Sequence, residues 1–482
     1  MGGYQGVCSE VKRQAVRGIG WAFTGSIASR IFQTAATLVL AKLLAPSDFG
    51  VFSLATIIIN SLVLFSDMGF AQVLIYLQGD IKRSANTAFV LCSGTVAVFA
   101  ALLWIGAPFV GDVFSEPSII LPIRAMAPML VLAGANSVPA VLLDKELKFE
   151  KKALIEVPTA FAYAVTAVVL AFLNCGVWSL VAAWILMVLV SCTITWAVSP
   201  WRPTIEFGVQ ESKKIITYGS HLVIGVFAAF AFLQIDKLSI GKWLGMTQLG
   251  YYTIAFTVCN LPATNLTAVV NRVMFPAYSK LADIPEIRKM YLQMVRHLSV
   301  IIFPSITALF ILAGPLIRIV YGSKWEGAVA LFYVLAFFGL FRAFGTTSDA
   351  VFMATDNPSL IRKVNIIQLV VAGVFVYPAA RFMGAFWVAV LFAAAAFTGM
   401  VFALLKVKNL LGIELSEWAG VLGAPAIATV AAGFISTIGN GEISWIIICR
   451  TFAVFALSYA GIILLLDRSL YRDMAAALRR TA

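Results

Sequence analysis

The sequence predicts an all-α membrane protein of about fourteen transmembrane helices, arranged as two six-helix lobes related by a parallel internal repeat, plus two C-terminal helices. Three observations predict this class. Apolar residue types make up 61% of the chain and charged residues only 12%, about half the charge of a soluble domain. Apolar runs long enough to cross a bilayer recur along the whole chain. Finally, residues 42–55 reappear in altered form as residues 242–255.

A bilayer core takes about 20 apolar residues per helix, and fourteen runs of that kind follow one another. The first six predicted helices are 21–41, 50–66, 88–110, 119–142, 154–174 and 177–198. The next six are 216–238, 250–270, 298–320, 329–353, 366–382 and 385–405, and the last two are 419–438 and 443–466. Two junctions are very short, at 174–176 and 383–384, so the separation of neighbouring helices depends there on a few turn residues.

The charge pattern predicts the topology. Counted alternately from the N-terminus, one set of loops carries about four times as many Lys and Arg residues as the opposite set. Because basic residues stay on the cytoplasmic side, both termini are expected in the cytoplasm, which requires an even number of helices. Fourteen satisfies that requirement.

The internal repeat divides the chain. In both copies of the repeated segment Lys, Leu, Gly and Ala recur in step, and each copy joins the first two helices of its half. Six helices separate the copies, so the halves share one orientation in the membrane, as in parallel-repeat transporters. We therefore predict an N-lobe at 1–199, a C-lobe at 200–408, and helices 13 and 14 with a cytoplasmic tail at 409–482.

Several function classes lack their signatures. No GxxxxGK[ST] phosphate loop is present, and the basic residues are spread between apolar runs rather than gathered for nucleic-acid binding. His221 and His297 are the only histidines, so no His-rich metal centre is expected. No cofactor is expected either. The six cysteines contain no CxxC pair and predict neither a zinc site nor a disulfide framework. They are Cys8, Cys92, Cys175, Cys192, Cys259 and Cys449.

Polar side chains inside the predicted helices are the candidate functional residues. The candidates for a substrate cavity are Arg30, Gln33, Asn60, Asn260, Thr264 and Arg342. The candidates for ion coupling are Asp67, Asp236 and Asp349. An Arg in the middle of a membrane helix costs roughly 2.5–3.5 kcal/mol, so it is expected to face water, a partner or a ligand.

Each candidate also has a structural interpretation. Arg30 would then form an ion pair between helices, and Asn60 and Asn260 would form interhelical hydrogen bonds. Asp236 lies near the predicted outer end of its helix beside Lys237, where a surface ion pair is as good an interpretation as a coupling site. Asp349 and Arg342 would pair with each other across two turns.

Several segments resemble a known family. Residues 30–33 (RIFQ), 43–50 (LLAPSDFG) and 65–70 (FSDMGF) resemble the opening of Wzx-like polysaccharide flippases, which form the polysaccharide transporter branch of the multidrug/oligosaccharidyl-lipid/polysaccharide exporter superfamily. Residues 145–149 (KELKF) resemble the basic loop after helix 4 of that family. Residues 235–237 (IDK) and 249–252 (LGYY) resemble its helix 7–8 junction. The similarity extends to about helix 12.

The resemblance implies two lobes with a central cleft that opens alternately to the two faces of the bacterial inner membrane. It also implies the substrate, an oligosaccharide repeat unit on undecaprenyl diphosphate, moved outward for exopolysaccharide or lipopolysaccharide synthesis. Expected partners are membrane lipids and, beside the lipid-linked substrate, a polysaccharide polymerase and glycosyltransferases. The guanidinium group of Arg can form two parallel hydrogen bonds to phosphate oxygens. Arg30 and Arg342 are therefore expected to contact the diphosphate or acidic sugars, and Asn60 and Asn260 are expected to contact the hydroxyl groups.

Three alternatives remain open at this level. A cation-coupled multidrug exporter of the same superfamily would share the fold, but its cavity is expected to be acidic. A flippase for lipid-linked peptidoglycan precursors is a close variant. A membrane-embedded polymerase or glycosyltransferase would need a large extracytoplasmic loop with catalytic groups, and no loop of that size is present.

Overall fold

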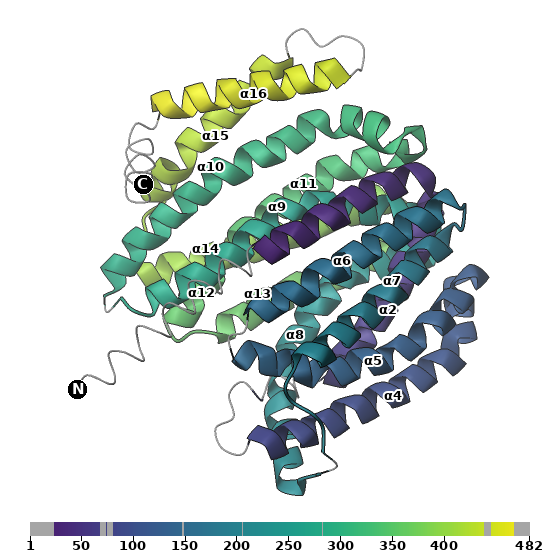
Figure 1. Ribbon diagram of the computed structural model, residues 1–482. Helices are drawn as coiled ribbons and strands as arrows, with labels where there is room; N and C mark the ends of the chain where they lie inside the picture. The colour runs from purple at the N-terminus through teal and green to yellow at the C-terminus, as the bar shows by residue number, and fades with distance from the viewer. Residues whose placement is uncertain are drawn as a thin grey trace. The chain divides into compact units, whose positions relative to one another are not determined.

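The structure is a computed structural model that describes residues 24–67, 74, 81–146, 149–204, 206–281, 283–437 and 445–466. Within that part every regular element is a helix, and helices or helical turns follow one another with few other residues between them (Figure 1). The predicted all-α class is confirmed. Eleven helices of the described part are long and apolar enough to cross a membrane, which makes the chain a multi-pass membrane protein.

Three predicted spans lie outside those eleven: 21–41, 216–238 and 250–270. They coincide with helical residues 24–43, with α8 (Val209–Leu244) and with α9 (Met246–Tyr278). The total of fourteen transmembrane helices stays a prediction.

The contacts divide the chain into two compact units. The first runs to Phe230 and includes Gly241–Gly250; the second contains Ala231–Ile240 and the chain from Tyr251 onward. Both α8 and α9 therefore contribute to each unit. The predicted boundaries at 1–199, 200–408 and 409–482 stay predictions.

The first unit is built around antiparallel neighbours in the sequence. Besides helical residues 24–43 it contains α2 (Pro46–Asp67), α4 (Ile81–Phe114), the short 3-10 helix η1 (Pro117–Ile119), α5 (Ile120–Lys145), α6 (Phe149–Phe172) and α7 (Val177–Val198). The helix α4 packs along α5, and α6 along α7, while α5 also contacts α2 and α7 (Figure 1). The predicted short break at 174–176 is confirmed, because Asn174 and Gly176 both adopt positive φ angles there.

The second unit continues with long helices interrupted at their ends by tighter or wider turns. Its elements are α10 (Ile284–Leu316), η2 (Ile317–Tyr321), η3 (Ser323–Ala328), α11 (Val329–Thr346), α12 (Ser348–Ala354), α13 (Ser359–Pro378), η4 (Ala379–Met383), α14 (Ala385–Leu411), α15 (Leu415–Thr437) and α16 (Trp445–Leu466). Small buried residues on α14, among them Ala389, Ala396 and Ala403, recur every seven positions. Side chains of this size let α14 approach its neighbours α11 and α13 closely.

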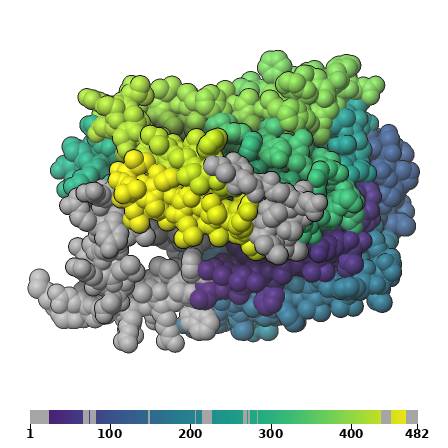
Figure 2. All heavy atoms as spheres, turned by 90° about the horizontal axis from the view of Figure 1, so that it is seen from above, coloured from purple at the N-terminus to yellow at the C-terminus, as the bar shows by residue number. Residues whose placement is uncertain are grey.

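The last two helices lie together against α10. A cluster of buried side chains on α15 and α16, which includes Ala428, Phe455 and Tyr459, packs on Val300 and Ile311 of α10. The Tyr459 hydroxyl also donates a 2.8 Å hydrogen bond to the Val300 carbonyl. Figure 2 shows the yellow surface of α16 adjoining the yellow-green surface of α15. These helices, which fall outside the sequence repeat, are thus integrated into the second unit.

The repeated segments meet each other within the first unit. A Cβ added at Gly50 would lie 2.7 Å from the Met246 carbonyl carbon, and one added at Gly250 would lie 2.7 Å from the Pro46 carbonyl carbon. Pro46 and Met246 are the first residues of α2 and α9. The contact is reciprocal, because each glycine lies against the carbonyl that begins the other helix. Only a residue without a side chain allows backbones to come this close.

Candidate functional site

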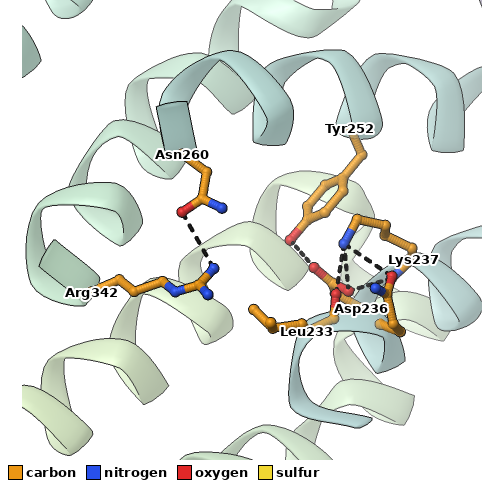
Figure 3. Close-up of polar contacts among 7 residues, drawn as sticks. Leu233, Asp236, Lys237, Tyr252, Asn260 and Arg342 are labelled. Carbon is orange, nitrogen blue, oxygen red and sulfur yellow. Dashed lines mark hydrogen bonds and ion pairs between the residues drawn. The ribbon is translucent and has the colours of Figure 1, made fainter. Parts of the chain in front are cut away.

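A buried ionic cluster lies in the second unit, at the meeting of α8 and α9. Asp236 is 0% exposed and Lys237 is 6% exposed. The Tyr252 hydroxyl donates a 2.7 Å hydrogen bond to Asp236 Oδ2, and the Lys237 ammonium lies 3.7 Å from Asp236 Oδ1 (Figure 3). A carboxylate, an ammonium and a phenol are therefore held together away from solvent. We call Asp236, Lys237 and Tyr252 the buried triad.

The Lys237 side chain has further partners that fix its position. Its ammonium donates a 2.6 Å hydrogen bond to the Leu233 carbonyl, one turn earlier, and a longer one of 3.4 Å to the Gln234 side chain. It also lies 3.9 Å from the centre of the Phe256 ring, within cation–π range. Because a buried charge is costly unless it is paired and hydrogen-bonded, these contacts explain how the cation is held inside the helices.

The interpretation of Asp236 and Lys237 as a surface ion pair is wrong. The sequence predicted that their helix ends at 238, which would have left both residues near its outer end. In the structure α8 continues to Leu244, so the pair lies almost two turns inside the helix. The neighbouring helix α9 then covers it with Tyr252 and Phe256.

A second polar contact links α9 to α11. Arg342 Nη1 donates a 3.4 Å hydrogen bond to Asn260 Oδ1 (Figure 3). Asn260 is buried at 9% exposure and Arg342 is half-buried. Asn260 thus makes the interhelical hydrogen bond that was one interpretation of it, and its partner is one of the other candidates. On α9 the Thr264 hydroxyl bonds back to the Asn260 carbonyl at 3.0 Å.

Asp349, the third acidic candidate, is half-buried on α12. Among the residues that the structure describes, no ion pair within 4.0 Å joins it to Arg342. The two side chains therefore form no direct ion pair across the two turns, although the carboxylate and the guanidinium still interact electrostatically.

Three candidates of the first unit lie on the surface of the structure. Arg30, Gln33 and Asn60 are all exposed. Arg30 lies one turn beyond Ser26, whose hydroxyl contacts the Glu156 carboxylate of α6 at 3.4 Å. In the described ranges no ion pair to Arg30 is found, so the interpretation of Arg30 as a structural ion pair has no support there. The Asp67 side chain lies outside the described residues.

Sequence reasoning missed two parts of this site. Tyr252 was noted only as part of a family motif, and Lys237 only as part of another motif and as a surface partner of Asp236. The available signal was that Asp236 and Lys237 lie side by side between the apolar residues Ile235 and Leu238, within a predicted membrane helix. Two adjacent charges at such a place require partners from other helices. In the described part of the chain no group of three or more His, Cys, Asp or Glu is arranged to hold a metal ion.

Comparison with known proteins assigns the chain to a family. The family model described as "Polysaccharide biosynthesis protein" matches residues 39–330. The chain is 24% identical over 376 residues to the teichuronic acid biosynthesis protein TuaB of Bacillus subtilis, covering 77% of each chain. It is 23% identical over 370 residues to the lipopolysaccharide biosynthesis protein WzxC of Escherichia coli K12, covering 74% of this chain and 73% of that one.

A solved structure has the same fold. The lipid II flippase MurJ in an inward closed conformation superposes with a TM-score of 0.77 at 14% sequence identity, covering 94% of this chain and 100% of that one. At this identity the likeness concerns the fold alone. The resemblance found in the sequence motifs is confirmed by the family match, which spans more than half of the chain. This chain belongs to the polysaccharide biosynthesis protein family.

Proposed function

We propose that the chain is a flippase that moves undecaprenyl-diphosphate-linked oligosaccharide units across the bacterial inner membrane, from the cytoplasmic to the outer leaflet, by alternating access. The observation that carries the proposal is the family match over residues 39–330. The chain transports its substrate and catalyses no covalent step. Its termini lie in the cytoplasm, and a polymerase and glycosyltransferases act beside it on the same polysaccharide.

The physical task is to move a hydrophilic head group through a layer that cannot solvate it. Charged groups in the bilayer core are costly, and the few that occur there mark substrate and ion pathways. Arg342 supplies such a group: a half-buried guanidinium that is held by Asn260 and has donors left over. Arg30 supplies a second, exposed guanidinium in the other unit. In the proposal both contact the diphosphate or acidic sugars, while Gln33, Asn60, Asn260 and Thr264 bind hydroxyl groups.

Coupling to an ion is assigned in this proposal to acidic side chains. Asp236 is the strongest of the three candidates because it is fully buried and shares its carboxylate with Lys237 and Tyr252. A proton or cation that reached this carboxylate would change the charge balance of the buried triad and so the stability of the packing between α8 and α9. Asp349 and Asp67 are the other two candidates.

The proposal is tested in a bacterial strain whose own polysaccharide flippase is deleted and that makes the polymer of this chain's gene cluster. The wild-type chain is expected to restore surface polymer. Arg342→Ala and Arg30→Ala are expected to lower export about tenfold or more, since a hydrogen bond to a charged group contributes about 1.5–3 kcal/mol. Arg342→Lys is expected to be intermediate, because an ammonium cannot form the bidentate contact.

The matched control is Arg362→Ala, which removes an exposed cation of α13 outside the candidate set. Immunoblots of the membranes establish equal protein levels. Full polymer export by both Arg30→Ala and Arg342→Ala would remove these residues from the proposal. Rescue of a strain that lacks its peptidoglycan precursor flippase, or resistance to cationic drugs without any polymer export, would instead support the two alternative transport functions.

A further inference from the structure

A basic pocket lies between the first turns of α10 and α15, apart from the candidate site. Its volume is about 420 Å³. The side chains that line it are Pro285, Arg288, Lys289, Leu292, Gln293, Arg296, Glu417 and Val421. The residues of α10 recur at intervals of three and four positions, so they form one face of that helix. The pocket is thus formed by residues of helices and not by a loop.

The charge of the lining is unbalanced. It holds three cations, Arg288, Lys289 and Arg296, and Glu417 is the one acid among the described lining residues. Glu417 is already engaged twice, because it forms an ion pair with Arg288 and accepts a 2.9 Å hydrogen bond from the Glu414 amide at the start of α15. That bond caps the helix. The lining therefore carries a net positive charge, with three cations against one acid.

The length of α10 places this pocket at the membrane surface. The helix has 33 residues, about 50 Å at 1.5 Å per residue, whereas the hydrocarbon core is about 30 Å thick. Residues 298–317, about 20 residues and enough for the core, contain no ionisable side chain. The preceding turns with the pocket consequently extend into the head-group layer.

An aromatic pair joins the two helices beside the pocket. Tyr291 of α10 and Trp418 of α15 pack edge to face, with ring centres 5.8 Å apart. Leu292 and Val421 give the pocket apolar walls beside its cations. A ligand with a single phosphate and attached acyl chains matches both kinds of wall, whereas a free phosphate ion uses only the cations.

We propose that this pocket binds the phosphate of an anionic phospholipid such as phosphatidylglycerol, on the side of the membrane where basic loops predict the cytoplasm. The lipid phosphate accepts hydrogen bonds from Lys289 and Arg296, and its acyl chains extend along α10 and α15 toward the core. The bound lipid joins α10 to the C-terminal helix pair, in addition to the Arg288–Glu417 ion pair.

The test uses the purified full-length chain and native mass spectrometry. The protein is titrated with phosphatidylglycerol and, separately, with phosphatidylcholine. Lys289→Gln/Arg296→Gln is compared with Arg362→Gln/Lys363→Gln, which removes the same charge from exposed positions of α13. Each basic residue near an anionic lipid contributes about fivefold in affinity, so the pocket variant is expected to bind phosphatidylglycerol about 30-fold more weakly than wild type. The control variant should retain the tight site.

A gain-of-charge variant keeps the test independent of folding losses. Gln293 lines the pocket and is exposed, and Gln293→Lys is expected to bind phosphatidylglycerol about fivefold more tightly. Equal affinity of the pocket and control variants would overturn the proposal, as would equal binding of the two lipids. Displacement of phosphatidylglycerol by millimolar inorganic phosphate would identify a site for free phosphate and would also overturn it. None of these readouts depends on transport.

Discussion

The reciprocal glycine contact gives the sharpest test of how the repeat is built. Replacing Gly50 with Ala would place a Cβ 2.7 Å from the Met246 carbonyl carbon, and closer still to its oxygen. Ordinary contacts between carbon atoms lie at about 3.5–4.0 Å, so the start of α9 must move by at least about 0.8 Å. The neighbour is backbone at the beginning of a helix, which cannot rotate out of the way. Overpacking of this kind costs about 1–3 kcal/mol.

We therefore expect Gly50→Ala and Gly250→Ala to lower the midpoint of thermal unfolding, measured on the detergent-solubilised chain by size-exclusion chromatography after heating. Since the first substitution already separates the two helices, the double variant should cost less than the sum of the single variants. Gly106→Ala on α4 and Gly373→Ala on α13 are the matched controls, because a Cβ there would meet nothing within 4 Å. They should be neutral or stabilising by up to about 1 kcal/mol. Equal midpoints for Gly50→Ala and Gly106→Ala would refute the close approach.

Three further predictions concern contacts in the second unit, each measured by the same thermal assay. Asp236→Asn leaves the Lys237 ammonium buried without its anion and is expected to lower the free energy of unfolding by about 3–5 kcal/mol. The double variant Asp236→Asn/Lys237→Met should lose less stability than Asp236→Asn alone. The opposite order would contradict a coupled pair. Tyr252→Phe removes a hydrogen bond to a buried carboxylate, for which we expect a loss of about 1.5–3 kcal/mol. Tyr459→Phe removes only the bond to the Val300 carbonyl and should cost about 0.5–1.5 kcal/mol, so a larger loss than for Tyr252→Phe would reverse our ranking.

Hydropathy located the membrane-embedded part of most helices but not their ends. Helix α7 begins and ends where the apolar run predicts, at Val177 and Val198, because turn residues bound that run on both sides. Helix α10 begins at Ile284, whereas the prediction began at 298. Its first turns are charged and lie beyond the hydrocarbon core, so the apolar run does not report them. The basic pocket lies in those turns, which is why the sequence did not predict it.

The burial of the candidate residues could not be predicted from the sequence, for a different reason. The period of a helix tells which side chains share a face, but it does not tell which other helix covers that face. Asp236 is buried because α8 extends to Leu244 and because Tyr252 and Phe256 of α9 lie over it. The alignment of the repeat paired Gly50 with Gly250 correctly as equivalent positions, yet equivalence does not reveal that the two copies touch.

The repeat relates the helices of the two halves, but it does not relate their charges. At the offset of the repeat, Asp236, Lys237 and Tyr252 correspond to Ala36, Thr37 and Phe52, none of which is ionisable at neutral pH or carries a phenol. Asn260, which is buried and bonded to Arg342, corresponds to the exposed Asn60. An ionic cluster at these positions of one half only favours different roles for the two halves, because a buried ion pair is often no more stabilising than apolar residues of similar volume. In the proposed mechanism Asp236 of the second unit is therefore the strongest candidate for coupling, and the exposed Arg30, Gln33 and Asn60 of the first unit are candidates for contacts with the substrate.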